Sequence, residues 1–437
     1  MKRSGCAANS RPPASIARER VFIQAPSRVK LAFVVQRYGA GIAGGSEMHC
    51  RQLAERLASR HDITVLTTCA RDYVTWTNAL PPGESMETGV RVRRFPVARP
   101  RNLKAFADLS DEVFDDLTST PEREEAWFRA NGPDVPALLD HLRAHGTDYD
   151  LVLFWAFRYA PSYFGLPLVA DRAILVPTAE EDPAVDLDVL PEYFARAAGY
   201  LFLTPEEEAL VSTRAGRTLQ PSRVIGIGLE PERGPHPSRA VLDRLGISPD
   251  FVLYLGRVDR NKGCATLIEY FQEYIEAEEQ PASPKPRSGE GGTTLVLAGP
   301  STLTIPDHPR IRALGYVEDE VRHALLSHAR ALIVPSPYES LSIVLLEAWN
   351  HGTPAVVNAY CKVLQGQVRR ADGGLYYRSS REFQEALSWL LSNETGRREL
   401  GEQGLAYVDR EYRWATVLGR VESLLEEVSR RRSAASA

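Results

Sequence analysis

Short apolar runs alternate with amphipathic helical patterns along most of the chain. Runs this short and this apolar are typical of strands covered on both faces of a parallel sheet. The helical stretches between them can supply the crossover connections that parallel strands require. The pattern therefore predicts an α/β fold, with strands in the first half at residues 31–36, 63–68, 90–95, 151–155, 173–177 and 200–203.

The alternation starts again in the second half, at residues 251–255, 294–298, 331–335 and 354–358. Between the halves, residues 228–250 are rich in proline and charge, which is typical of a linker. We therefore predict two Rossmann-like domains, residues 30–227 and 228–413, whose parallel sheets face an interdomain cleft. A C-terminal helix in residues 414–437 is expected to pack back toward the first domain.

Four segments depart from this pattern. Residues 1–29 are basic but lack the apolar stretch of a signal peptide, so we expect a mobile arm. Residues 75–89 and 108–145 contain tryptophans but are otherwise polar, and are expected to be insertions on the scaffold. Residues 276–292, rich in proline and glycine, are expected to form a flexible surface loop.

Composition and charge narrow the classes of function. The net charge of −5 argues against a nucleic-acid binder whose affinity depends on neutralising phosphates. The five cysteines form no C-x-x-C pair, and no apolar run reaches the roughly 18–20 residues of a membrane span, so we expect a cytoplasmic protein. Peripheral contact with the inner face of a membrane is an alternative, through the basic arm or through Arg91, Arg93, Arg94, Arg99 and Arg101. Those five arginines would otherwise form a solvated strand edge and loop.

A glycine-rich turn follows the first expected strand. Gly39, Gly41 and Gly44 satisfy the G-x-G-x-x-G pattern of dinucleotide-binding folds. That pattern also expects an acidic residue at the end of the second strand, but the nearest, Asp72, comes after the turn. We favour the interpretation that Gly44 and Gly45 open a helix whose N–H groups bind a phosphate or a sugar hydroxyl. A tight turn without a ligand is the other interpretation.

Two cations follow the first strand of the second half. Arg257 and Lys262 lie on a loop bounded by Gly256 and Gly263. The planar fork of an arginine and the point charge of a lysine suit a diphosphate. The alternative is an ordinary solvated loop.

Two glutamates eight residues apart provide the strongest functional signal. Glu339 follows an apolar run, and Glu347 lies inside an otherwise apolar helix, where a carboxylate without a partner is costly. A ribose diol would pair well with Glu347, and a structural pair with an arginine is the alternative. Beside Glu339, the N–H groups of Ser340 and Leu341 would meet a phosphate or sugar oxygen.

The histidines and acidic residues show no metal-binding spacing. The nine histidines form no H-E-x-x-H motif. D-x-D matches at 148–150 and 186–188 are expected by chance among 57 acidic residues, and they lie away from the phosphate-binding elements. We therefore predict no catalytic metal and no cofactor.

Taken in order, the Gly44–Gly45 pair, the Gly-Arg…Lys-Gly loop, the E-x7-E spacing and the Gly-Thr-Pro at 352–354 resemble the family 4 glycosyltransferases. The resemblance spans about residues 30–430. It implies a retaining, metal-independent enzyme of the GT-B fold, of the kind acting in cell-surface polysaccharide assembly. Such an enzyme moves a sugar from a nucleoside-diphosphate sugar to a hydroxyl of a glycan or lipid-linked acceptor. The resemblance implies catalytic roles for Arg257, Lys262 and Glu339, and donor binding by these three with Gly44, Gly45, Ser340, Leu341 and Glu347.

One position departs from the family pattern. Relatives often carry a histidine near the position of Glu180 that points at the transferred sugar. A carboxylate cannot donate a hydrogen bond at neutral pH unless its pKa is raised. We therefore treat Glu180 as a candidate catalytic residue, while an inactive sugar-nucleotide-binding protein stays an alternative. A nucleotide-sugar epimerase of the same fold and an NAD-dependent oxidoreductase are the other two.

Overall fold

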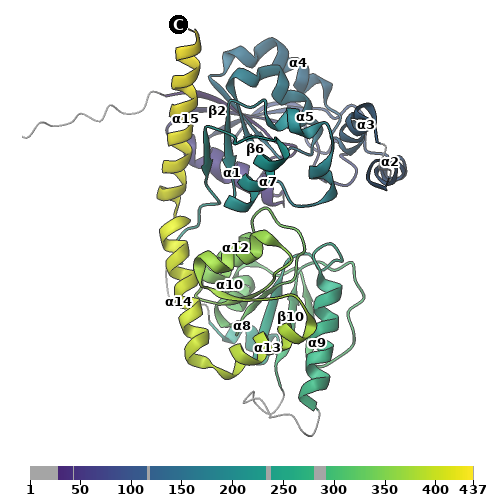
Figure 1. Ribbon diagram of the computed structural model, residues 1–437, viewed down its shortest axis with the longest axis vertical. Helices are drawn as coiled ribbons and strands as arrows, with labels where there is room; N and C mark the ends of the chain where they lie inside the picture. The colour runs from purple at the N-terminus through teal and green to yellow at the C-terminus, as the bar shows by residue number, and fades with distance from the viewer. Residues whose placement is uncertain (1–27, 43, 116–118, 233–237, 280–291, 437) are drawn as a thin grey trace, which may run out of the picture.

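The chain folds into two α/β domains, one above the other along the long axis of the molecule (Figure 1). A computed structural model describes residues 28–42, 44–115, 119–232, 238–279 and 292–436. Almost all of the arm expected at 1–29, and most of the loop expected at 276–292, lie outside these residues.

The first domain is built on a mainly parallel sheet. Among the described residues its strand order is β3-β4-β2-β1-β5-β6-β7-β8, with β3 antiparallel to β4 and the other pairs parallel. The order reverses direction between β1 and β5, so the loops after these two neighbours diverge and leave a crevice at their carboxyl ends. The strands are β1 (Lys30–Val34), β2 (Asp62–Thr68), β3 (Gly83–Glu87), β4 (Val90–Phe95), β5 (Leu151–Trp155), β6 (Ala173–Val176), β7 (Gly199–Phe202) and β8 (Ser222–Val224).

The second domain repeats this plan with a fully parallel sheet in the order β11-β10-β9-β12-β13-β14, within the part of the chain that the structure describes. Here the order reverses between β9 and β12, which gives a second crevice. The strands are β9 (Phe251–Leu255), β10 (Thr294–Ala298), β11 (Ile311–Gly315), β12 (Leu332–Val334), β13 (Ala355–Asn358) and β14 (Gly374–Tyr377).

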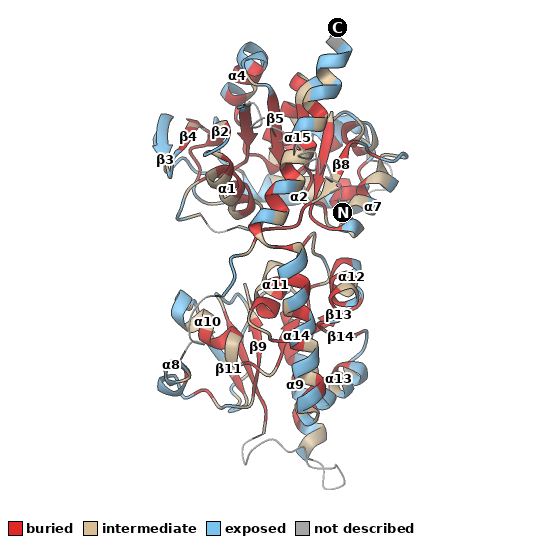
Figure 2. Ribbon diagram, turned by 90° about the vertical axis from the view of Figure 1, so that its left-hand side faces the viewer, coloured by how far each residue is buried: buried red, intermediate tan, exposed pale blue. Residues whose placement is uncertain are grey.

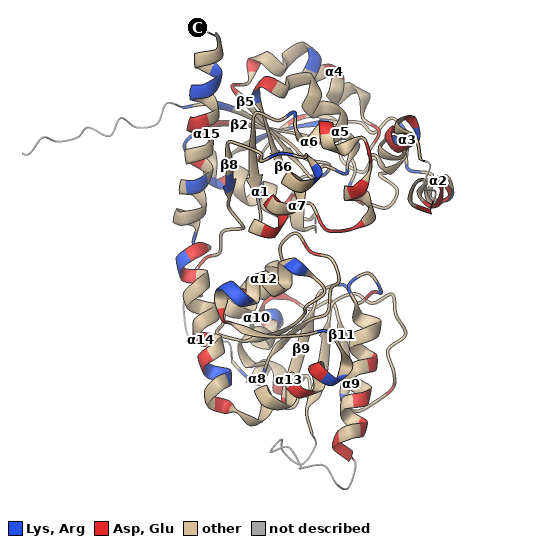
Figure 3. Cartoon of the chain, viewed as in Figure 1, with Lys and Arg blue, Asp and Glu red and all other residues tan. Residues whose placement is uncertain are grey.

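Helices cover both sheets, and the central strands are buried in each domain (Figure 2). Charged side chains of both signs are interspersed over the two domains (Figure 3). In the described part of the chain, no helix is both long and apolar enough to cross a membrane. The helices are α1 (Gly45–Leu57), α2 (Leu103–Asp115), α3 (Pro121–Asn131), α4 (Pro136–His145), α5 (Ala160–Gly165), α6 (Leu190–Phe194), α7 (Pro205–Arg214), α8 (Ala240–Arg244), α9 (Cys264–Glu279), α10 (Asp319–His328), α11 (Ile343–Asn350), α12 (Lys362–Ala371), α13 (Ser380–Ser392), α14 (Glu394–Glu411) and α15 (Trp414–Ser436).

The ten strands expected from the sequence all occur, and their ends differ from the expected ones by at most two residues. The four strands that the pattern missed are β3, β8, β11 and β14, and each of them is an edge strand of its sheet. An edge strand has one neighbour and is less completely covered, so its sequence is shorter or more polar than that of a central strand. The two insertions attach through aromatic residues, because Trp76 and Trp127 are almost fully buried.

The chain crosses between the domains twice, and the two crossings run side by side. Leu229 N donates to the Tyr412 carbonyl at 2.7 Å. Beyond that point α15 returns along the first domain (Figure 1), where Val417 and Val421 are buried. His61 Nε2 lies 2.8 Å from the Glu422 carboxylate of this helix. The last helix thus fastens the second crossing to the first domain.

Candidate functional site

A cavity of about 520 Å³ lies between the domains, where the two crevices face each other. It is lined by the segments that follow β1, β5 and β6 in the first domain and β9 and β12 in the second. The carboxyl ends of parallel strands at a reversal of strand order are where open α/β sheets bind ligands. The fold therefore places a candidate binding site where both domains contribute residues.

Two helix N-termini meet at this cavity from opposite sides. α1 begins at Gly45 and α11 at Ile343, and both residues line the cavity. A Cβ added at Gly45 would lie only 3.8 Å from Ile343 Cδ1, so the two helix ends are in close proximity. The first turns of both helices concentrate positive potential there, which favours an anion. The structure thus brings together four of the residues expected to bind the donor, namely Gly44, Gly45, Ser340 and Leu341.

Lys262 and Glu339 form an ion pair on the second-domain side of the cavity. Lys262 Nζ donates to Glu339 Oε1 at 2.7 Å. The neighbouring Gly263 has a φ of +73°, and a Cβ there would clash with the Pro335 carbonyl. This close approach seats the loop after β9 directly on the segment after β12. Burial alone would lower the pKa of Lys262, but the Glu339 carboxylate more than offsets that effect and raises it, so the lysine stays cationic.

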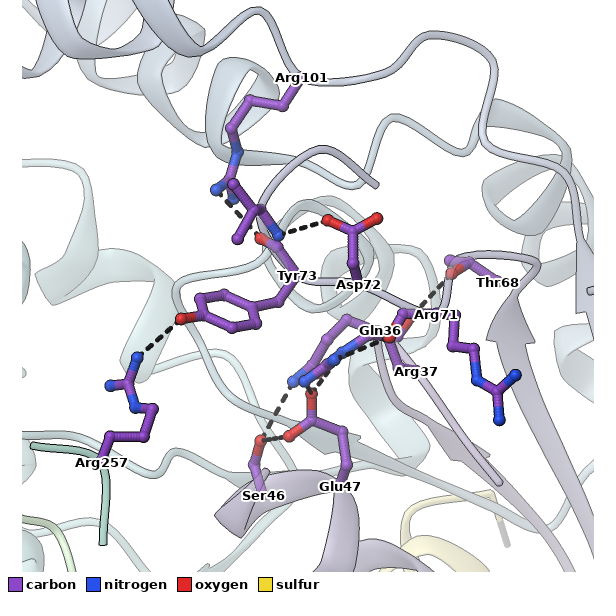
Figure 4. A network of polar contacts seen from close by, with 11 residues as sticks. Gln36, Arg37, Ser46, Glu47, Thr68, Arg71, Asp72, Tyr73, Arg101 and Arg257 are labelled. Atoms are coloured by element: carbon purple, nitrogen blue, oxygen red, sulfur yellow. Dashed lines mark hydrogen bonds and ion pairs between the residues drawn. The ribbon is translucent and has the colours of Figure 1, made fainter. Parts of the chain in front are cut away.

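Arg257 is held at the cleft by a residue of the opposite domain. Its Nη1 donates to the Tyr73 hydroxyl at 2.7 Å (Figure 4), and its Nη2 lies 3.6 Å from Asp259. The Arg257 side chain is 52% exposed, so its remaining donors are open to a ligand. Tyr73 therefore sets the position of the arginine while the domains are in this arrangement.

The loop that presents Tyr73 is shaped by Asp72. The Asp72 carboxylate accepts hydrogen bonds from Val74 N at 2.8 Å and from Thr75 N at 2.6 Å. Burial tends to raise the pKa of Asp72, but these hydrogen bonds prevail and lower it. This carboxylate is thus occupied by its own loop. Asp72 also comes after the turn that follows β2, and not at the end of that strand, where a dinucleotide-binding fold would need an acid for the ribose, so the structure disfavours the NAD alternative.

A second ion pair, Arg37 with Glu47, lies on the first-domain side and was missed in the sequence. Arg37 Nε and Nη2 donate to Glu47 Oε1 at 2.9 and 2.5 Å, and both side chains are 6% exposed. The carboxylate packs so tightly on Gly44 that a Cβ there would clash with it. The available signal was a cation soon after a buried strand and an acid in the first helical turn.

Glu180 lies in the same cavity, on the segment after β6. Burial raises its pKa, the Glu339 charge adds to the shift, and Arg158 and Lys262 oppose it. The backbone around it is strained, because Thr178 and Ala156 at the ends of adjacent strands have φ values of +49° and +60°. Strained residues of this kind cluster at functional sites.

Glu347 is placed differently from the other candidate residues. It does not line the cavity, and its carboxylate forms an ion pair with Arg322 of α10. Every residue of α11 is buried or partly buried, and Ile343 and Val344 pack against the hydrophobic core. The arginine partner matches the structural alternative, and ribose binding by Glu347 stays a prediction.

His49, in α1, is a further buried residue at the cavity that the sequence did not reveal. Its Nδ1 accepts from Trp155 Nε1 at 3.0 Å, and its Nε2 lies 2.9 Å from the Gly226 carbonyl. Burial lowers its pKa to about 4, so the ring is neutral at physiological pH. With both nitrogens bonded, His49 joins α1, β5 and the segment after β8.

The arginines considered for membrane contact are engaged within the first domain. Arg94 is 7% exposed and donates to the Tyr38 carbonyl, and Arg101 donates to the Asn131 carbonyl. Three more pair with acidic residues, Arg91 with Asp62, Arg93 with Glu84 and Arg99 with Asp134. Membrane contact stays a prediction, but all five of these arginines already have partners within the first domain.

Comparison with known proteins agrees with this geometry. Residues 249–393 match the family described as glycosyl transferases group 1. The chain is 26% identical to a glycogen synthase of Mycobacterium tuberculosis over 76% of this chain and 78% of that protein. It is 29% identical to a D-inositol 3-phosphate glycosyltransferase of Acidothermus cellulolyticus, over 77% and 75%.

Solved structures show the same fold. HepE of Anabaena, in complex with UDP and glucose, superposes with a TM-score of 0.65 at 15% identity, covering 92% of this chain and all of that one. The two parallel-sheet domains and these relatives confirm the predicted GT-B fold. The chain is therefore a glycosyltransferase of the GT-B fold that carries a glycosyl transferases group 1 domain at residues 249–393.

Proposed function

We propose that this glycosyltransferase moves a sugar from a nucleoside-diphosphate sugar to a hydroxyl of a glycan or lipid-linked acceptor. One observation carries the proposal: two helix N-termini, Arg257 and Lys262 converge on a single cavity between the domains. Together they form a site for a compact dianion such as a diphosphate. The UDP and glucose bound by HepE support this choice of donor.

The same residues would assist the chemistry. As the glycosidic bond breaks, negative charge grows on the leaving diphosphate, and Arg257 and Lys262 would stabilise it without a metal ion. Glu339 would hold Lys262 in place and contact the transferred sugar. We propose that the anomeric configuration is retained by attack on the same face, with the leaving phosphate accepting the proton of the acceptor hydroxyl.

Glu180 would serve the sugar from the opposite wall. Burial beside Glu339 raises its pKa, which is the direction a carboxyl group needs in order to donate a hydrogen bond. A protonated Glu180 could donate to a sugar hydroxyl, as a neutral histidine would. This supports an active enzyme over an inactive binding protein.

Turnover with a panel of nucleoside-diphosphate sugars and mixed glycan and lipid-linked acceptors tests the proposal. We expect release of the nucleoside diphosphate only when an acceptor is present, in EDTA as well as without it. The anomeric proton coupling of the product in NMR should match that of the donor. Isomerisation of a donor without acceptor would show an epimerase instead, and an inverted product would contradict retention.

Glu347 is tested separately, by thermal shift with nucleoside diphosphates on Glu347→Ala and Arg322→Ala. If Glu347 holds the ribose, its loss should abolish stabilisation by the nucleotide, while loss of Arg322 should reduce it less. Equal stabilisation of the wild type and Glu347→Ala would limit Glu347 to its ion pair with Arg322.

A further inference from the structure

Three side chains from separate segments of the second domain and its linker converge at one point. They are Glu232 in the linker, His323 in α10, and His351 directly after α11. His323 Nδ1 lies 3.2 Å from His351 Nε2. Glu232 Oε1 lies 3.4 Å from the first of these nitrogens and 3.3 Å from the second. The three atoms therefore form a nearly equilateral triangle.

The sides of this triangle match the ligand spacing around a tetrahedral zinc ion. With zinc–nitrogen and zinc–oxygen bonds of about 2.0–2.1 Å, neighbouring ligand atoms are about 3.3–3.4 Å apart. Two imidazoles and one carboxylate are also a ligand set that zinc prefers. Within the described part of the chain, these three are the one group of His, Cys, Asp or Glu side chains that lie close enough together to hold an ion.

The surroundings orient one ligand in advance. His351 Nδ1 lies 2.9 Å from Ser327 Oγ, so a proton on Nδ1 can be donated to the hydroxyl and the Nε2 lone pair then faces the triangle. The His351 side chain is 3% exposed, whereas those of Glu232 and His323 are each 38% exposed. The site thus has one fixed ligand and a solvent side where water can complete the coordination.

We propose that Glu232, His323 and His351 bind a zinc ion, with water as the fourth ligand. The ion would tie the linker to α10 and α11 close to the hinge between the domains. The same two helices are joined alongside by the ion pair of Arg322 with Glu347, and Asn350 Nδ2 donates to the Glu230 carbonyl of the linker at 3.0 Å. The zinc would therefore reinforce contacts that already join these elements, apart from the cavity that we assign to the donor.

A competing explanation is that no ion binds, and that a hydrogen bond joins the two imidazole rings beside the Glu232 carboxylate. Zinc binding to the full-length chain, stripped with a chelator and dialysed, separates the two. We expect one zinc per chain by mass spectrometry of the metal content and by calorimetric titration. Zinc should also raise the melting temperature, and Co²⁺ should give the visible spectrum of a four-coordinate site.

His323→Ala and Glu232→Gln alter the two exposed ligands, so both variants should fold. Each should weaken zinc binding by about 10-fold or more. His145→Ala is the matched control, because His145 pairs with Asp148 at 3.1 Å on the surface of the first domain, and it should leave binding unchanged. No binding by the wild type, or equal binding by the wild type and His323→Ala, would overturn the proposal.

Discussion

Each wall of the cleft carries an ion pair of similar construction, yet the two pairs differ in access. On the first-domain side, Arg37 follows β1 and meets Glu47 in the first turn of α1. On the second-domain side, Lys262 follows β9 and meets Glu339 just before α11. The first pair is 6% exposed on both sides, whereas Lys262 and Glu339 are 30% and 13% exposed.

The difference in exposure distinguishes an ion pair with a structural role from one that can also contact a ligand. Arg37 donates twice to Glu47, whose other oxygen accepts from Ser46, so this pair is fully engaged in holding the glycine turn against α1. Lys262 spends one donor on Glu339 and keeps two that a ligand can use. We infer that the first wall is fixed in shape and the second carries the charge that responds to the donor.

The largest effect on stability should come from breaking the buried ion pair of Arg37 with Glu47. Arg37→Ala leaves the Glu47 carboxylate buried without its cation, which we expect to lower the free energy of unfolding by about 3–5 kcal/mol in urea denaturation. Arg99→Ala is the matched control, since Arg99 pairs with Asp134 at the surface and should cost less than about 1 kcal/mol. Similar values for the two variants would show that the buried pair is not structural.

Breaking the more exposed ion pair of Lys262 with Glu339 should affect activity and not stability. Lys262→Met should lower kcat/KM by about 10²–10³, because it removes charge stabilisation of the leaving diphosphate. Its free energy of unfolding should change by less than about 1 kcal/mol. Lys362→Met is the control, because Lys362 pairs with Glu181 outside the cavity and should leave kcat/KM nearly unchanged. Equal losses in the two lysine variants would contradict a specific role for Lys262.

This comparison also shows what could be read from the sequence. The second wall was predicted almost completely, because Arg257 and Lys262 lie on one short loop after a buried strand and Glu339 follows another buried strand. On the first wall, Gly44, Gly45 and Glu180 were predicted, and four polar residues were missed, namely Arg37, Glu47, Tyr73 and Arg158. These four follow different strands or lie in α1, and they come together only when the strands are ordered in the sheet. The central strands were predicted by their apolar runs, while the four edge strands were not.

The pH dependence of kcat/KM should reveal the role of Glu180, which lies on the first-domain wall. As the pH rises through its raised pKa, wild-type Glu180 ionises and loses the hydrogen that it can donate, so kcat/KM should fall by up to about tenfold per pH unit. In Glu180→Gln the amide keeps its N–H donors, so that alkaline fall should disappear. Glu181→Gln, at the adjacent exposed glutamate, should keep it. A pH profile identical in the wild type and Glu180→Gln would exclude this role.

The smallest expected effect concerns the hydrogen bond between Arg257 and Tyr73, which joins the two walls of the cleft. Tyr73→Phe removes the hydroxyl that accepts from Arg257 but keeps the ring. Donor affinity should weaken by about two- to tenfold, the value of one hydrogen bond of roughly 0.5–1.5 kcal/mol. Tyr360→Phe, at an exposed tyrosine that does not line this cavity, is the control in the same titration. Unchanged affinity in Tyr73→Phe would mean that the contact does not position Arg257 for the donor.

Calorimetric titration of a nucleoside diphosphate and of its parent nucleoside tests most directly the claim that the cleft is a diphosphate site. For the nucleotide whose sugar the wild type turns over, we expect Lys262→Met and Arg257→Ala each to weaken binding of the diphosphate by about 10-fold or more. Binding of the nucleoside should be unchanged in both variants. Equal diphosphate affinity in the wild type and both variants would contradict the account, because the two cations would then not hold the diphosphate.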